Sequence, residues 1–366
     1  MTQQFKRERV TSLLGKVPLG VNSAGQSVYG GLDKLAWVTD MNSRKKNLEL
    51  KQRLLSLISG GDYLIKVRPA GKDECGGHYR WILEIRLKVK SRTHPVLLVI
   101  QFDPTNSQRG FMRVELSPQH YSAQQITDLF VWLGRRGRIG KYLYRGLRNA
   151  WITTIHYALD VVGMKLHDYF IGLACVRKGK FNDLHGKEEG LRLGSTTVVA
   201  SVYEKVDAPE ISTEKRYEQA LLMLEENQFR RFLRLELRLS PGKKKLLLSN
   251  LLRLDNLVSK LAFYDRNALT DPELETDFAR LLRENAPYPV ARATYKPSAM
   301  LNGKPVSSTK KAADKRVDKV MSQHRVELFD SEAIWAMLPL VLEKLGILAQ
   351  PQYWQPDLRQ KWLQRI

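Results

Sequence analysis

The feature that most constrains the fold is the segment RFLRLELRL at 231–239, in which apolar and charged side chains alternate without a break. A period of two is the pattern of a β-strand, because successive side chains point to opposite faces of a sheet. The leucines of this segment share one face, and the other face carries Arg234, Glu236 and Arg238. A strand of this kind needs a partner for its apolar face, so the chain is expected to contain a sheet with a packed side.

Further segments with alternating or β-branched residues extend the sheet, and Gly, Pro, Asn and Asp clusters separate them. The expected strands are 33–40, 62–68, 79–90, 95–102, 110–116, 151–162, 174–177 and 197–205. Helical spacing of apolar residues predicts helices at 42–58, 123–134 (capped by Ser122), 165–173, 243–264, 271–285, 310–319 and 331–345, the last interrupted by Pro339. This mixture predicts an α+β fold, with mainly antiparallel sheets flanked by helices and a small helical C-terminal region.

The domain organisation follows from changes in composition along the chain. Residues 1–30 mix Gly, Ser and Pro with charges and are expected to form a mobile leader. A catalytic domain is expected over 31–285. The proline-rich segment 286–310 is expected to be a linker, and 311–366 to be a helical region.

Charge indicates the class of partner. The chain has 60 Lys and Arg against 38 Asp and Glu, a formal net charge of +22, and a sequence pI near 9.9. An excess of this size favours a polyanion. No apolar run is long enough to span a membrane, the N-terminus lacks the apolar core of a secretory signal, and the two cysteines form no ligand pair. We therefore expect a cytoplasmic protein with no membrane partner and two reduced thiols.

One group of side chains could perform chemistry on a nucleic acid backbone. In TVVASVYEK, alternation places Tyr203 and Lys205 on one face of the strand. In WITTIHYALDVV it places Asp160 on one side, and in RFLRLELRL it does the same for Glu236. If these strands share a sheet, Asp160, Tyr203 and Glu236 converge. A tyrosine can attack phosphorus to form a covalent intermediate, and carboxylates suit Mg²⁺ or Mn²⁺.

Basic side chains near this group are candidates for phosphate contacts. Lys205, Arg234 and Arg238 are expected to face the same side as the tyrosine. Each observation also has a structural explanation: a strand tyrosine is most often a packing residue, and an alternating charged strand is most often a solvated face with cross-strand ion pairs.

A second basic segment, RRGRIGKYLYRGLR at 135–148, contains no acidic residue and interleaves cations with Tyr142 and Tyr144. Cations that follow phosphates and rings that stack on bases are typical of grooves for single-stranded nucleic acid, although a solvated helix face is the alternative. The expected DNA contacts are Arg135, Arg136, Arg138, Lys141 and Arg145.

Three segments, in order, resemble a known family. GFMRVELSP, then TTIHYALDVVG, then LRLGSTTVVASVYEK followed by RFLRLELRL, are similar to motifs of replication initiation factors of the Rep_trans type, from rolling-circle plasmids and filamentous phages. The resemblance covers about 95–240. It implies that Tyr203 is the nicking tyrosine and that Asp160 and Glu236 hold a divalent ion, Mg²⁺ or Mn²⁺.

The resemblance also implies a function. Such a protein, usually a dimer, recognises a double-stranded origin and nicks one strand where it is exposed as single strand. The helical region 311–366 would then be a candidate for origin binding. The tyrosine becomes joined to the 5′-phosphate, and the 3′-hydroxyl primes a host polymerase while a host helicase is recruited. The expected function is therefore that of a rolling-circle DNA replication initiator and nickase.

Three alternatives stay open at this point. A conjugative relaxase uses the same chemistry at a different DNA site. A non-enzymatic DNA-binding regulator could keep the same scaffold, and it predicts that Tyr203→Phe changes nothing. An RNA-binding accessory protein would need only the basic segment, and it predicts RNA preference without dependence on a metal.

Overall fold

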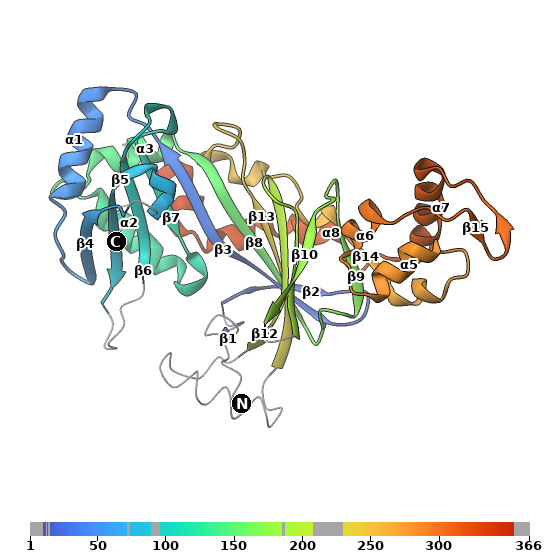
Figure 1. The fold of residues 1–366 in the computed structure, drawn as a ribbon. Helices are drawn as coiled ribbons and strands as arrows, with labels where there is room; N and C mark the ends of the chain where they lie inside the picture. Colours follow the sequence, from blue (N-terminus) through green and yellow to red (C-terminus); the bar gives the residue numbers. More distant parts are fainter. Residues whose placement is uncertain are drawn as a thin grey trace. The chain divides into compact units, whose positions relative to one another are not determined.

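The computed structural model describes residues 10–11, 13, 15–71, 74–88, 96–184, 187–207 and 230–354. They form an α+β fold with a large, mainly antiparallel sheet flanked by helices, which confirms the predicted fold class (Figure 1). The chain divides into two compact units. Unit 1 comprises 1–31, 158–238 and 255–337, and unit 2 comprises 32–157, 239–254 and 338–366. Strands β3 (Ser27–Thr39) and β8 (Trp151–Val162) contribute residues to both.

Unit 2 is a sheet with one helix-covered face. Next to β3 come β7 (Met112–Leu116), β6 (Val96–Pro104), β5 (Tyr79–Leu87) and β4 (Tyr63–Pro69), each antiparallel to its neighbour. The register aligns the apolar residues Trp37, Val114, Ile100 and Leu83 across four strands. Trp37 contacts Phe130 of α2 with ring centroids 6.2 Å apart, so this row is packed against helices.

The segment 32–157 of unit 2 contains the helices α1 (Arg44–Leu55), α2 (Ala123–Gly134) and α3 (Lys141–Arg148). The prediction that Ser122 caps a helix is confirmed. Its Oγ accepts from the Gln125 backbone at 3.1 Å, and the Gln125 side chain accepts from the Ser122 backbone at 2.9 Å. This reciprocal pair satisfies two amide groups that the start of a helix leaves without partners.

Unit 1 contains the strands predicted to carry chemistry. Their order is β10 (Gly179–Leu184), β11 (Lys187–Leu193), β12 (Val198–Asp207), β13 (Arg230–Leu239) and then β8. The short β1 (Val10–Thr11) pairs in parallel with β12, and β2 (Val17–Val21) pairs with the beginning of β3. From Val17 onward the predicted leader is thus strand structure, and residues 1–9 lie outside the described residues.

Two of the predicted helices are wrong. Residues 165–173 contain β9 (Tyr169–Leu173), and 243–264 contain short 3-10 turns followed by β14 (Leu261–Asp265). The two strands pair antiparallel with each other, and β14 also pairs with β17 (Arg325–Val326). The expected strand at 174–177 is a turn and loop. Long-range pairing decided the conformation of these apolar segments, and local periodicity could not show it.

A second core of unit 1 lies among helices α5 (Thr276–Arg283), α6 (Tyr288–Thr294) and α7 (Lys310–Gln323). A hairpin of β15 (Met300–Leu301) and β16 (Lys304–Pro305) stands between α6 and α7. We call residues 271–324 the hairpin module. It includes the predicted linker 286–310, and Ala291 and Tyr295 of that segment lie in its core. This segment is therefore part of a folded module.

The predicted C-terminal helical region is helical but divides between the units. α7 and α8 (Ser331–Ala336) belong to unit 1, whereas α9 (Leu338–Glu343) and two 3-10 turns (Gly346–Ala349 and Pro351–Trp354) belong to unit 2. The helical pattern breaks before Leu338, so that Pro339 falls in the first turn of α9, where its missing amide is tolerated. Residues 355–366 lie outside the described residues.

No helix in the described ranges has the length and apolar character needed to cross a membrane.

Candidate functional site on strands β12, β13 and β8

The alternation of β13 has the predicted geometry, but both faces of the strand are covered. Leu233, Leu235 and Leu237 are fully buried on one side. On the other side Arg234 is 0% exposed and Glu236 is 5% exposed. The alternative interpretation, a solvated charged face, is therefore wrong for the centre of this strand. Charges removed from water need partners, because desolvation of an unpaired ion costs several kcal/mol.

Tyr203 and Glu236 are brought together as predicted. The Tyr203 hydroxyl donates to Glu236 Oε2 at 2.9 Å, across the neighbouring strands β12 and β13. The Arg238 guanidinium donates to the same carboxylate, from Nε to Oε1 at 3.0 Å and from Nη2 to Oε2 at 3.3 Å. The tyrosine itself is partly exposed. The result is a phenol held against a carboxylate at an accessible position.

Lys205 lies beside this pair but is largely enclosed. Its Nζ is 5.5 Å from the centroid of the Tyr203 ring, and the residue is 8% exposed. A cation over a phenol ring interacts favourably with the ring and also stabilises negative charge that develops on the phenol oxygen. Lys205 is thus better placed to act on Tyr203 than to hold a distant phosphate.

Asp160 and Arg234 form a buried ion pair. Arg234 Nε donates to Oδ1 and Nη2 donates to Oδ2, both at 2.6 Å, and both side chains are buried. Lys16 Nζ lies 4.0 Å from Oδ2 of the same aspartate. Two-point contact of this kind fixes the orientation of both planar groups. The predicted phosphate contact of Arg234 does not fit this position, because its guanidinium is enclosed and committed to Asp160.

The carboxylates do not fit a divalent ion in this arrangement. Both oxygens of Asp160 accept from Arg234, and both oxygens of Glu236 accept from Arg238 or Tyr203. A Mg²⁺ or Mn²⁺ site needs carboxylate oxygens that face a common point, without arginines between them. Within the part of the chain that the structure describes, no group of three or more His, Cys, Asp or Glu side chains could hold a metal.

The basic segment 135–148 differs from its prediction in its aromatic residues. Tyr142 and Tyr144 are 5% and 2% exposed, so their rings are enclosed in unit 2 and present no face to a base. The Tyr142 hydroxyl donates to Glu49, and this hydrogen bond raises the pKa of the tyrosine. The prediction that these rings stack on bases is therefore wrong.

The cations of this segment are divided. Arg135, Arg136 and Lys141 are exposed, and Arg145 is partly exposed. Arg138 is used internally: its guanidinium lies 4.4 Å from the Trp132 ring centroid and donates to the Ile58 carbonyl at 2.7 Å. The segment retains a basic surface without a stacking platform.

Two features escaped the sequence prediction. Lys16 lies far from Asp160 in the chain, and no motif connects them. An open groove of about 620 Å³ in unit 2 is lined by Arg109, Arg113 and Lys243, together with polar side chains. Its lining comes from separate segments, so no contiguous basic run could have indicated it.

No protein-family model matches the chain, and no curated protein sequence matches it. The assignment of this site therefore depends on its chemistry and on the order of the motifs.

Proposed function

We propose that this protein nicks DNA with Tyr203 as the nucleophile, as a rolling-circle replication initiator does. The observation that carries the proposal is the hydrogen bond from the Tyr203 hydroxyl to Glu236, on a partly exposed strand face beside Arg238 and Lys205. A nucleophile hydrogen-bonded to a base that is itself oriented by a third group is the arrangement that covalent catalysis uses. The net charge of +22 supplies the attraction to a polyanion.

The residues support the following reaction. Glu236 accepts the phenol proton as the Tyr203 oxygen bonds to phosphorus, and the bond from phosphorus to the 3′-oxygen breaks. The 3′-oxygen leaves with the electron pair and takes a proton from water, which gives a 5′-phosphotyrosine and a free 3′-hydroxyl. Arg238 holds Glu236 in place, and Lys205 counters the charge that develops on the phenol. The reverse sequence reseals a strand.

A divalent ion stays a prediction of the resemblance, and no step above requires one. Asp160 could bind a metal only after releasing Arg234, because both carboxylate oxygens are engaged. The homodimer, the helicase and the polymerase likewise stay predictions of the resemblance, and a conjugative relaxase would share the same chemistry.

A second candidate is a DNA-binding regulator without catalysis. The observation that favours it is that both Asp160 and Glu236 have arginine partners, as carboxylates in a purely structural polar core do. The two candidates differ in whether Tyr203 ever bonds to DNA.

The deciding experiment incubates the protein with labelled single-stranded oligonucleotides that tile both strands of the encoding replicon, in Mn²⁺, Mg²⁺ or EDTA. Tyr203→Phe is compared with Tyr142→Phe, a matched control because Tyr142 also donates to a glutamate. We expect an SDS-resistant adduct with wild type and Tyr142→Phe and none with Tyr203→Phe. An adduct in EDTA would fit the described site, and one seen only with metal would show that the reaction needs a metal that the described arrangement of Asp160 and Glu236 does not explain.

Two outcomes would contradict the proposal. An adduct that survives in Tyr203→Phe would place the nucleophile elsewhere, with Tyr157 and Tyr169 the next to substitute. No adduct on any strand, together with tight duplex binding, would favour the regulator.

A further inference from the structure

The helices of the hairpin module pack around a shared hydrophobic core. Phe278 of α5 and Tyr295 after α6 meet with ring centroids 5.5 Å apart, and Val317 of α7 is fully buried in the same cluster. The four-residue turn between α5 and α6 contains Asn285 in the left-handed region, with φ 60°. Two helices joined by such a turn form a compact pair, and the hairpin and α7 follow this pair in the chain.

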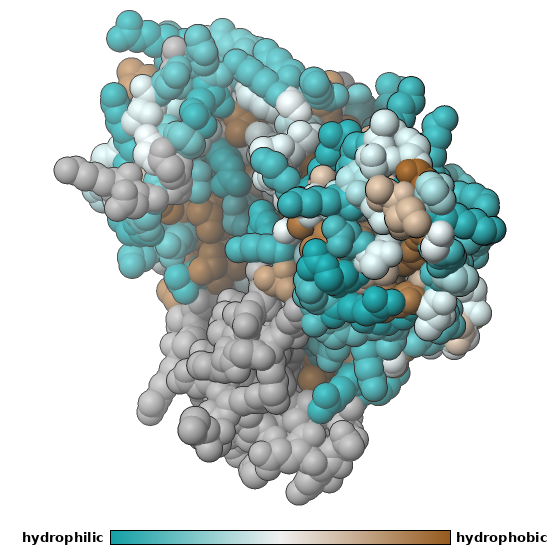
Figure 2. Space-filling model, turned by 45° about the vertical axis from the view of Figure 1, so that its right-hand side comes forward, coloured by the Kyte–Doolittle hydropathy of each residue, from teal (hydrophilic) through white to brown (hydrophobic). Residues whose placement is uncertain are grey.

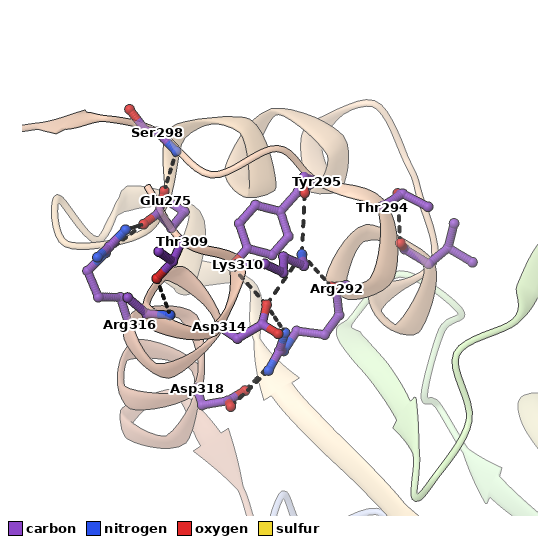
Figure 3. Close-up of polar contacts among 12 residues, drawn as sticks. Glu275, Arg292, Thr294, Tyr295, Ser298, Thr309, Lys310, Asp314, Arg316 and Asp318 are labelled. Atoms are coloured by element: carbon purple, nitrogen blue, oxygen red, sulfur yellow. Dashed lines mark hydrogen bonds and ion pairs between the residues drawn. The ribbon is translucent and has the colours of Figure 1, made fainter. Parts of the chain in front are cut away.

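Ion pairs hold the parts of the module together (Figure 3). Arg292 of α6 reaches between Asp314 and Asp318 of α7, with 2.9 Å from Nη2 to Asp318 Oδ2. Arg316 of α7 contacts the buried Glu275 that precedes α5, and it also donates to the Ser307 carbonyl after the hairpin at 2.9 Å. Helix α7, the hairpin and the helix pair therefore keep a fixed relation.

Contacts of this kind engage all the acidic side chains of the module. Each carboxylate in 271–324 has a basic partner, and the pairs are Asp271 with His324, Glu273 with Lys319, Glu275 with Arg316, Asp277 and Glu284 with Arg280, and Asp314 and Asp318 with Arg292. The module has 10 Lys and Arg against 7 Asp and Glu, so its formal charge is +3.

Four lysines of the module have no carboxylate partner: Lys296, Lys304, Lys311 and Lys315. All are exposed, and none of their side chains makes a hydrogen bond or ion pair with another described residue. Lys311 and Lys315 lie one turn apart on the same side of α7, about 6 Å along its axis. Lys304 follows the tight turn at Asn302 and Gly303, both in the left-handed region. The first turn of α7 has no acidic residue, so Lys311 adds to the positive end of the helix dipole.

The surroundings of these lysines fit duplex DNA better than other polyanions. The aromatic rings of the module pack inside it, as in the edge contact of Phe278 with Tyr288, whose centroids are 6.0 Å apart, so it offers no platform for unstacked bases. The apolar residues of α7 face the core, which leaves no stripe to enter a membrane. Figure 2, in which this part comes forward, shows a mainly hydrophilic surface over it. A helix beside a projecting hairpin fits the wide major groove of B-DNA, and the deep, narrow groove of A-form RNA excludes it.

We infer that the hairpin module binds duplex DNA through Lys296, Lys304, Lys311 and Lys315, which contact backbone phosphates. The inference deepens the proposed function. It rests on that function only for which DNA the protein meets in the cell. Duplex binding by these lysines does not depend on nicking by Tyr203.

The test measures the affinity of the full chain for a fluorescent mixed-sequence duplex of about three helical turns across a range of salt concentrations. The variant Lys304→Ala/Lys311→Ala/Lys315→Ala removes three unpaired cations. The matched control, Arg280→Ala/Lys319→Ala/Arg325→Ala, removes three cations that are 54%, 64% and 49% exposed but are ion-paired. We expect the first variant to bind about tenfold more weakly, with a salt slope lower by about 0.9 per lysine, and the control to stay near wild type. Lysine-to-arginine substitutions at the same three positions should restore binding.

Several results would overturn the inference. These are an unchanged affinity, an equal loss in the control, a failure of the arginine variant to restore binding, or an equal or larger loss for single-stranded DNA, duplex RNA or phosphatidylserine vesicles. Circular dichroism confirms that each variant is folded. The oligonucleotide adduct assay separates this inference from the proposed function: a missing adduct with the expected loss of duplex affinity contradicts only the function, and a normal adduct with unchanged duplex affinity contradicts only the inference.

Discussion

The strand face around Tyr203 and the basic segment 135–148 were both selected from the sequence as functional, and the structure treats them differently. On β12 and β13 the predicted side chains meet, with Tyr203 bonded to Glu236. In the basic segment the cations are partly on the surface, but Tyr142 and Tyr144 are enclosed. In the first region the predicted contact between Tyr203 and Glu236 is present, and Tyr203 is partly exposed. The basic segment retains cations on its surface but presents neither tyrosine ring to solvent.

The difference comes from the geometry of the two kinds of backbone. In a strand, every second residue shares a face, so a single known position assigns the others. In the short helix α3, Tyr142 and Tyr144 are two positions apart and point about 200° apart around the axis. Both are buried, together with Leu143 and Leu147, so most of the circumference of this helix is enclosed. Interleaved cations and rings therefore predict little about exposure when the segment is helical.

The largest expected effect contrasts two arginines. Arg234→Met leaves Asp160 buried with only Lys16 nearby, and we expect the free energy of unfolding to fall by about 3–5 kcal/mol. Arg138→Met in the basic segment removes a contact over Trp132 and one bond to a carbonyl, and it should cost about 1 kcal/mol. Urea unfolding of both variants measures the difference. Equal losses of unfolding free energy in the two variants would show that the Asp160 and Arg234 pair stabilises the fold no more than the contacts of Arg138 do.

A smaller effect contrasts two glutamates that accept from tyrosines. Glu236→Gln removes the group that takes the Tyr203 proton, so we expect adduct formation to slow by about 100-fold. Glu49→Gln changes the partner of Tyr142 and should leave the rate as it is. Single-turnover rates with the oligonucleotide found in the adduct assay give the comparison. A Glu236→Gln variant as fast as wild type would remove Glu236 from the mechanism, and an equally slow Glu49→Gln variant would show that the loss of rate is not specific to Glu236.

The smallest effect concerns the basic segment itself. The variant Arg135→Ala/Arg136→Ala/Lys141→Ala should weaken the binding of single-stranded DNA by less than about tenfold and lower the salt slope by about 0.7 per contact. Tyr142→Phe should leave this affinity unchanged, because the ring is enclosed. Fluorescence anisotropy at several salt concentrations measures the affinity of both variants for single-stranded DNA. A marked loss in Tyr142→Phe would restore the stacking interpretation.

Alternation predicted much of the fold. The strand expected at 151–162 is β8 over those residues, and the Ser122 cap is present. The sequence failed where an apolar segment has a distant partner. The strand β9 forms because β14 lies beside it, and each segment alone has a helical spacing of apolar residues. Pro287 and the other prolines of 286–310 indicated a linker, yet Pro287 immediately precedes α6, where a proline fits the start of a helix.

The candidate site was predicted in part for the same reason. Alternation assigned Tyr203, Glu236 and Arg234 to faces, and strand neighbours then brought the first two into contact. It could not show that Arg234 would occupy both oxygens of Asp160, because that contact depends on how far one strand is displaced along the next. To judge whether Asp160 can bind a metal, one must know how the two strands are positioned along each other. Alternation within a single strand does not give this position.

The buried pair of Asp160 and Arg234 also constrains how this protein can evolve. Replacing either partner alone leaves an enclosed charge, whereas replacing both by apolar residues of similar volume is often neutral. Any path between these two states passes through a destabilised intermediate unless both codons change together. In relatives of this chain, positions 160 and 234 should therefore be either both charged or both uncharged, and this covariation would be visible without any measurement of activity.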